Sequence, residues 1–107
     1  MPLIQQTLQL GAELPGRNTR KEVLDFIVAE CDNAAKVLPA VYDNANTGRA
    51  TLGAALTLKV NAQLLDKQYP QAAAAAKQVI DMGQYHLYDN YGTMFTEVAA
   101  ENNSEVI

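Results

Sequence analysis

The side chains that could act as nucleophiles or metal ligands are few and lie far apart in the sequence. The 107 residues contain one cysteine, Cys31, and one histidine, His86. A nucleophilic cysteine needs a base within hydrogen-bond reach, and a zinc site needs three or four ligands. The sequence offers neither arrangement. We therefore interpret Cys31 as a small buried thiol and His86 as a surface or turn residue.

The carboxylates show no spacing that is typical of catalysis or of calcium binding. Asp25, Glu30 and Asp32 fall on the polar side of an expected helix, which indicates a solvated face. Three further glutamates near the C-terminus offer oxygen ligands but lack the spacing of a calcium loop: Glu97, Glu101 and Glu105. The sequence predicts no metal site, no cofactor site and no enzymatic activity.

One arginine and several tyrosines are the candidates for ligand contacts. Arg49 is expected at a helix start, where a positive charge opposes the helix dipole, so we favour a structural ion pair over a ligand contact there. Tyr42, Tyr85, Tyr88 and Tyr91 could form a surface on which sugar rings stack. We favour the alternative, in which they cover the ends of a helical hairpin.

Composition and charge narrow the class of protein. The formal net charge is -4 with scattered basic residues, which argues against a nucleic-acid partner. The chain has no apolar run of about 18 residues that could span a membrane. The first ten residues, "MPLIQQTLQL", lack the basic start and long apolar centre of a signal peptide. The length fits one domain, residues 1–107.

The first expected helix begins after Thr19, which with Glu22 has the spacing of a capping box. Pro39 is expected to end this helix near Leu38. The apolar residues recur on one face, as in a helix that packs on a neighbour. They are Leu24, Ile27, Val28, Cys31, Ala35 and Leu38.

The second expected helix, residues 49–66, is rich in alanine and leucine on nearly every side. A helix of this kind is usually enclosed by others. Gly53, Ala54 and Ala55 would let the backbone of a neighbouring helix approach closely.

A third helix is expected from "YPQA", with Pro70 at its first position and Gly83 as a left-handed stop. Its apolar stripe consists of Ala72, Ala75, Ala76, Val79 and Ile80. The short link between the second and third helices predicts an antiparallel hairpin.

The remaining segments are expected to be irregular or short. Residues 1–18 and 40–48 are rich in turn-forming residues. A short helix is expected at residues 91–99, and extended pieces at "PLI" and at the final "EVI". The expected fold is all-α, with antiparallel helical hairpins and short irregular or extended ends.

The hairpin resembles a tetratricopeptide unit. Tyr69 and Ala72 in "QYPQA" have the spacing at which that repeat's second helix begins, whereas Leu56 and Val60 replace the usual aromatic residue and glycine of the first. One pair is visible, and about three are normally needed for a stable stack.

Four blocks, taken in order, resemble the SusD/RagB family of outer-membrane glycan-binding lipoproteins of Bacteroidetes. They are "PLI" with "RNTRKEVLDFIVAECDNAAKVLP", then "GRATLGAALTLKVNAQLL", then "YPQAAAAAKQVIDMGQYHLYDNY", and finally "MFTEVAAENNSEVI". The second block is close to the family's most recognisable signature, a Gly-Arg-Ala-Thr start on an alanine-rich helix.

This resemblance implies a helical fold built on degenerate tetratricopeptide-like pairs. It also implies a cell-surface protein of nutrient and polysaccharide uptake, which captures oligosaccharide without cleaving it. The partner would be a SusC-like TonB-dependent transporter in the outer membrane. Family members are several times longer and carry a lipid-anchored cysteine. Cys31 does not stand in for that cysteine, because it lies in the middle of a helix.

We therefore expect the chain to be an internal segment of a SusD-like protein, serving mainly as scaffold. The membrane would be reached only through a lipid anchor outside this segment. The alternative is a free-standing tetratricopeptide-like module for protein interaction. The sequence names neither the glycan nor the residues that face the transporter.

Overall fold

The computed structural model describes residues 1–95 and residue 105. Its elements, in order, are the helix α1 (Arg20–Ala35), the short 3-10 helix η1 (Asn44–Asn46), the helix α2 (Leu52–Leu65) and the helix α3 (Tyr69–Asp81). The described residues contain no strand, so the expected all-α class is confirmed, and "PLI" is irregular rather than a strand. The final "EVI" lies largely outside the described residues.

The start of α1 is the capping box that the sequence predicts. The backbone N–H of Glu22 donates to the Thr19 hydroxyl at 3.2 Å, and the N–H of Thr19 donates to the Glu22 carboxylate at 2.8 Å. The helix ends at Ala35, earlier than the predicted Leu38. Leu38 instead donates its N–H to the Ala34 carbonyl at 2.9 Å in a closing turn, since a residue before proline avoids helical geometry.

The helix α2 begins at Leu52, three residues later than predicted. The hydroxyl of Thr51 accepts a hydrogen bond from the N–H of Ala54 at 3.3 Å and so caps the helix. Gly48 before it has a φ of +88°, which belongs to a turn. Arg49 therefore lies outside the helix, and the expectation that it sits at a helix start is wrong.

The link from α2 to α3 is a tight left-handed turn. The N–H of Gln68 donates to the Gln63 carbonyl at 2.8 Å, and the N–H of Lys67 donates to the Leu64 carbonyl at 3.0 Å. This pair of bonds is the Schellman motif, in which one residue takes a left-handed conformation. Lys67 occupies that position with a φ of +60°, although glycine is the usual choice.

The helix α3 begins at Tyr69, so Pro70 is its second residue rather than its first. After α3 ends at Asp81, Gly83 takes a φ of +63°, which confirms the predicted left-handed stop. Residues 91–95 form turns instead of the start of the short helix expected at 91–99, and residues 96–99 lie outside the described part.

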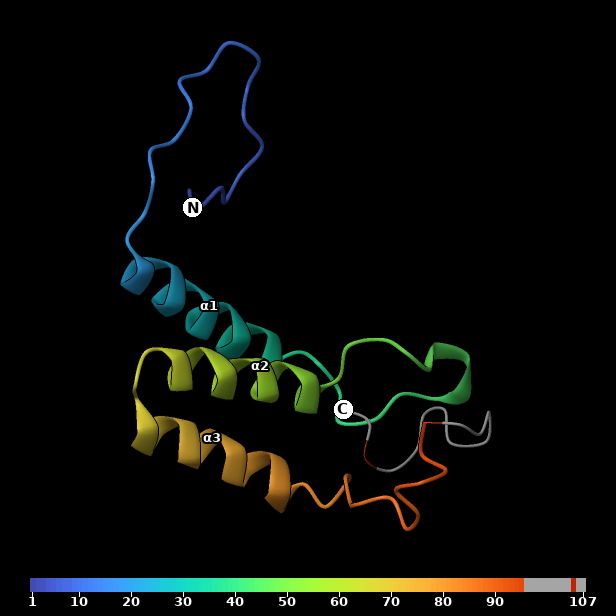
Figure 1. Ribbon diagram of the computed structural model, residues 1–107. Coiled ribbons are helices and arrows are strands. Elements are labelled where there is room, and N and C mark those ends of the chain that lie inside the picture. Colours follow the sequence, from blue (N-terminus) through green and yellow to red (C-terminus); the bar gives the residue numbers. More distant parts are fainter. Residues whose placement is uncertain (96–104, 106–107) are drawn as a thin grey trace.

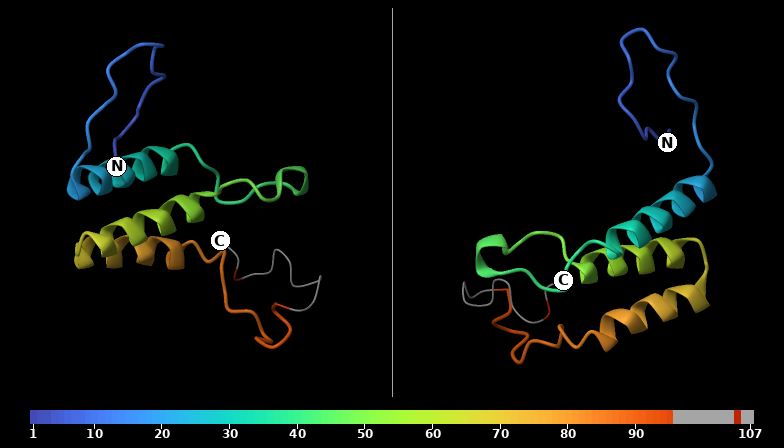
Figure 2. Two further views of the ribbon diagram at one scale, coloured as in Figure 1. Left: turned by 45° about the horizontal axis from the view of Figure 1, so that its top comes forward. Right: turned by 180° about the vertical axis from the view of Figure 1, so that it is seen from behind.

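The three long helices form one layer in the order α1, α2, α3 (Figures 1 and 2). The helix α2 contacts both others, as its apolar sides predict, whereas the described residues of α1 and α3 do not contact each other. The buried apolar residues are mostly small: Leu24, Cys31, Ala55, Leu56, Ala62, Ala72 and Ala75. Ile80 was expected in the α3 stripe but is 75% exposed, so that assignment is wrong.

The chain as a whole is extended rather than rounded. Its radius of gyration is 17.4 Å, whereas a compact chain of this length has about 13 Å. Residues 1–18 are irregular, as predicted, and form an arm that stands away from the helices (Figure 1). The loop around η1 and the segment after α3 lie at the end of the layer opposite the α2–α3 link (Figure 2).

Candidate functional site

Tyr85 is the candidate ligand residue with the clearest structural contact. Its hydroxyl lies 3.2 Å from the hydroxyl of Thr51, the N-cap of α2. Its ring lies against Gly53, where a Cβ atom would overlap the ring. Gly53 thus makes room for a side chain, not for the neighbouring backbone that the sequence led us to expect.

Tyr42 and Tyr88 are half-buried, and Arg49 is exposed. The backbone N–H of Tyr88 donates to the carboxylate of Glu105 at 3.0 Å. Within residues 1–95 and 105, Arg49 forms no ion pair, so the expected ion pair and the ligand roles of these residues stay predictions. Among these candidates and within the described residues, Tyr85 alone has a side chain that is hydrogen-bonded to another residue. This contact fits a role in covering the helix ends.

An aromatic pair lies further along the segment that follows α3. The rings of Tyr91 and Phe95 meet edge to face, with centroids 5.6 Å apart and an interplanar angle of 81°. Their exposed fractions are 78% and 74%. Sequence reasoning missed Phe95, although two aromatic residues four positions apart were the available signal.

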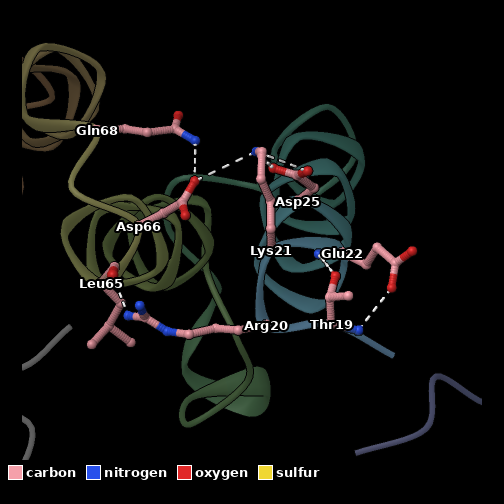
Figure 3. Close-up of polar contacts among 8 residues, drawn as sticks. All are labelled: Thr19, Arg20, Lys21, Glu22, Asp25, Leu65, Asp66 and Gln68. Carbon is pink, nitrogen blue, oxygen red and sulfur yellow. Dashed lines mark hydrogen bonds and ion pairs between the residues drawn. The ribbon is translucent and has the colours of Figure 1, made fainter. Parts of the chain in front are cut away.

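A polar network joins the start of α1 to the link between α2 and α3 (Figure 3). The Arg20 guanidinium donates to the carbonyl of Leu65, the last residue of α2. The Lys21 ammonium lies 3.7 Å from the Asp66 carboxylate, which also accepts a hydrogen bond from the Gln68 side-chain amide at 2.5 Å. A cation near the C-terminus of α2 is favourable to that helix's dipole.

Hydrogen bonds at the start of α1 shift the pKa of two side chains. The hydrogen bond to Asp25, at 2.8 Å, is the main reason why the pKa of Lys21 is raised. The N–H and hydroxyl of Thr19 lower the pKa of Glu22, because they stabilise its ionised form. Since 45 residues separate Arg20 from Leu65, no local pattern could have revealed this network.

One ion pair connects α1 and α2 at a partly buried position. The Lys59 ammonium lies 2.6 Å from the Asp32 carboxylate, and the Lys59 side chain is only 17% exposed. Asp32 was expected on a solvated face together with Asp25 and Glu30. Asp25 and Glu30 are exposed, whereas Asp32 is half-buried and pairs with a residue of another helix.

The remaining side chains that could act as nucleophiles or metal ligands do not cluster within the described residues. Cys31 is buried, as predicted, and burial raises the pKa of its thiol, which disfavours the reactive thiolate. His86 is exposed. Within the described residues no three side chains of metal-binding type come together, and Glu97 and Glu101 lie outside that part.

A pocket of about 460 Å³ lies within the irregular N-terminal arm. It is lined by Leu3, Ile4, Gln5, Gln6, Leu8 and Pro15, none of which has an ionisable side chain. The pocket therefore supplies no acid, base or charge for catalysis. Among the described helices none is both long and apolar enough to cross a membrane.

Comparison with known proteins shows a likeness to a solved structure. No protein-family model and no curated protein matches the chain. A solved structure of a SusD-like protein from Bacteroides fragilis matches 98% of this chain with 31% sequence identity and a TM-score of 0.90. The chain spans 21% of the length of that protein. The match covers the helical layer and nearly all of the flanking segments, and the chain accordingly belongs to the SusD-like family.

Proposed function

We propose that the chain is part of a SusD-like lipoprotein of the RagB type on the cell surface of a bacterium of the Bacteroidetes. The whole protein would capture oligosaccharides and present them to a SusC-like TonB-dependent transporter in the outer membrane, without cleaving them. The membrane would be reached through a lipid anchor outside these residues. This segment would serve mainly as scaffold.

The observation that carries the proposal is the likeness to the Bacteroides fragilis protein. An identity of 31% over 98% of the chain, with a TM-score of 0.90, supports a common family role in addition to a common fold. Because the match spans 21% of that protein, the ligand site of the whole protein would be formed elsewhere or only in part here.

The scaffold role is supported by what the side chains do. The small residues of α2 and α3, such as Ala62 and Ala72, are buried between helices. Arg20 and Lys59 bind groups on a neighbouring helix or link. Tyr85, one of the tyrosines that could stack on a sugar, is held against Gly53 and Thr51. Side chains engaged in this way stabilise the layer instead of contacting a sugar.

Glycan binding by the complete polypeptide tests the proposal. The full reading frame should encode a signal peptide with a lipid-attachment cysteine upstream of these residues. The purified full-length protein should bind oligosaccharides on a glycan array and should co-purify with a TonB-dependent transporter from solubilised outer membranes. A full-length protein that binds no glycan and no transporter contradicts the proposal.

Calorimetry of the 107-residue chain tests the scaffold role separately. We expect no heat of binding with oligosaccharides that the full-length protein binds. A clear isotherm that is lost in the Tyr42→Ala or Tyr88→Ala variant would instead assign ligand contacts to this segment. Arg49→Ala belongs in the same series, since Arg49 is exposed.

The alternative function is a tetratricopeptide-like module that binds another protein. The observation that favours it is the exposure of large apolar residues on the helices, including Leu58 at 55% and Ile80 at 75%. A reading frame that starts at Met1 and encodes no lipoprotein signal would favour this alternative over the leading proposal.

A further inference from the structure

The two ends of the irregular arm, residues 1–18, meet at Asn18. The backbone N–H of Leu3 donates to the side-chain oxygen of Asn18 at 2.8 Å, and the N–H of Asn18 donates to the Met1 carbonyl at 3.2 Å. Leu3 and Asn18 are half-buried, whereas the other residues of the arm are exposed. Residues 4–17 therefore form a loop that is closed at its base, as in an Ω-loop.

Asn18 is itself held by the capping box of α1. Its side-chain nitrogen donates to the Glu22 carboxylate at 3.4 Å, and the same carboxylate oxygen accepts the N–H of Thr19 at 2.8 Å. The Asn18 amide thus uses its oxygen for the arm and its nitrogen for the helix. We call the arrangement of Met1, Leu3, Asn18 and Glu22 the Asn18 latch.

The loop between the two ends has no comparable attachment to the helices. Among the described residues, the hydrogen bonds of residues 4–17 are confined to one turn, in which the N–H of Ala12 donates to the Gln9 carbonyl at 3.1 Å. Glu13 and Arg17, the charged residues of this stretch, form no ion pair within residues 1–95 and 105. A segment with so few contacts opens at a low free-energy cost once its base is released.

The pocket within the arm depends on the closed base. Its lining includes Leu3, which is held by the latch, and Pro15, which lies on the returning part of the loop. If Leu3 separates from Asn18, these two sides of the pocket move apart. The latch therefore determines whether the volume of about 460 Å³ is enclosed by the arm.

We propose that the Asn18 latch is a conformational device, about which residues 4–17 open and close as one unit while α1 keeps its cap. The closed form requires both hydrogen bonds of the Asn18 side chain. The open form retains the capping box, because that box uses Thr19 and Glu22 without Asn18. The inference concerns the arm and does not depend on the proposed function.

Distance measurements between two spin labels in the complete polypeptide test the inference. The labels are attached to Thr7→Cys in the arm and Ala29→Cys on α1, both at exposed positions, after Cys31 and any other cysteine have been replaced by alanine. With the latch intact we expect one narrow distance peak. In Asn18→Ala we expect a broad second population, with the ratio of closed to open molecules lowered about tenfold by the loss of two side-chain hydrogen bonds.

A matched control and a second variant separate the latch from a general effect on α1. Asn33→Ala removes another side-chain amide of α1, whose partners Glu30 and Lys36 lie three residues away, and should leave the narrow peak unchanged. Leu3→Pro removes the N–H that donates to Asn18 and leaves α1 untouched, so it should broaden the distribution as Asn18→Ala does.

Each of the other outcomes contradicts the inference. A narrow peak in both Asn18→Ala and Leu3→Pro shows that the latch does not hold the arm. Broadening in Asn18→Ala alone shows that Asn18 acts without Leu3. A broad distribution with the latch intact shows that the arm is not closed. Loss of helical circular dichroism in Asn18→Ala shows that α1 does not keep its cap when the arm opens.

Discussion

The hydroxyl oxygens of Thr51 and Tyr85 lie 3.2 Å apart, which attaches the segment after α3 to the residue that caps α2. The two residues are 34 positions apart in the sequence. Their contact lies where α2 begins, at the end of the layer where the η1 loop also lies. The ring of Tyr85 fills the space that the missing side chain of Gly53 leaves. Thr51, Gly53 and Tyr85 therefore form one structural unit.

This unit predicts that Gly53→Ala expels the Tyr85 ring. Because the new Cβ overlaps the ring, we expect the free energy of unfolding to fall by about 1 kcal/mol, even though alanine favours helix more than glycine does. In a Tyr85→Ala background the same change should be neutral or stabilising. Urea denaturation of the four proteins of this double-mutant cycle measures the coupling. Equal effects of Gly53→Ala in both backgrounds would show that the ring does not occupy this space.

Removing the charge of Asp32 should destabilise the layer more than removing an exposed charge. Asp32→Asn leaves the Lys59 ammonium, 17% exposed, without its ionic partner, and we expect a loss of about 1–2 kcal/mol. The control is Asp81→Asn, which breaks the exposed pair with Lys77 and should cost under about 0.5 kcal/mol. Thermal and chemical denaturation of the two variants provide the comparison. Equal losses would contradict the structural role of the Lys59–Asp32 pair.

Lys67→Gly should stabilise the protein. Lys67 has a φ of +60°, a conformation that costs a residue with a side chain about 1–2 kcal/mol and that glycine adopts freely. Part of this gain is offset by the greater freedom of glycine in the unfolded chain, which leaves about 0.5–1 kcal/mol. Lys36→Gly is the control, since Lys36 caps the end of α1 with a φ of -77°, and this variant should lose stability. A lower unfolding midpoint for Lys67→Gly would rule out the left-handed turn.

The contribution of Glu22 to stability should depend on pH. The folded protein lowers the pKa of this carboxyl below its ordinary value of 4.5, mainly through the Thr19 N–H. Its ionised form therefore stabilises the fold above pH 4.5, and this contribution is lost as the pH falls through the lower pKa of the folded state. Glu22→Gln should be less stable than the original protein at neutral pH and equally stable in acid. A stability difference that does not change between pH 7 and pH 2.5 would contradict this assignment.

Local patterns in the sequence were enough to predict the three long helices, but not the turns at residues 91–95, where a short helix was expected. Thr19 and Glu22 specify the start of α1, and Gly83 specifies the turn after α3, because each acts within a few residues. The boundaries at Ala35 and Leu52 were missed because competing local groups act there. The turn before Pro39 shortens α1, and the hydroxyl of Thr51 caps α2 later than residue 49.

Contacts between distant residues could not be predicted from the sequence. Arg20 binds the Leu65 carbonyl, and the Tyr85 ring fills the space at Gly53, only because the layer brings these segments together. Ile80 has the right spacing for the α3 stripe, yet no described helix lies on that side to bury it. The candidate ligand residues Tyr42, Tyr88 and Arg49 have no distinguishing local pattern, and their roles stay predictions.

The order of contacts in the layer has a consequence for cooperativity. Among the described helices, α2 contacts both α1 and α3 while these two do not contact each other, so each outer helix packs on α2 and on no other helix of that part. In such a linear arrangement an outer helix can detach while the remaining pair stays folded. The amides of α3 should then exchange with deuterium before those of α2, whose loss would separate the whole layer.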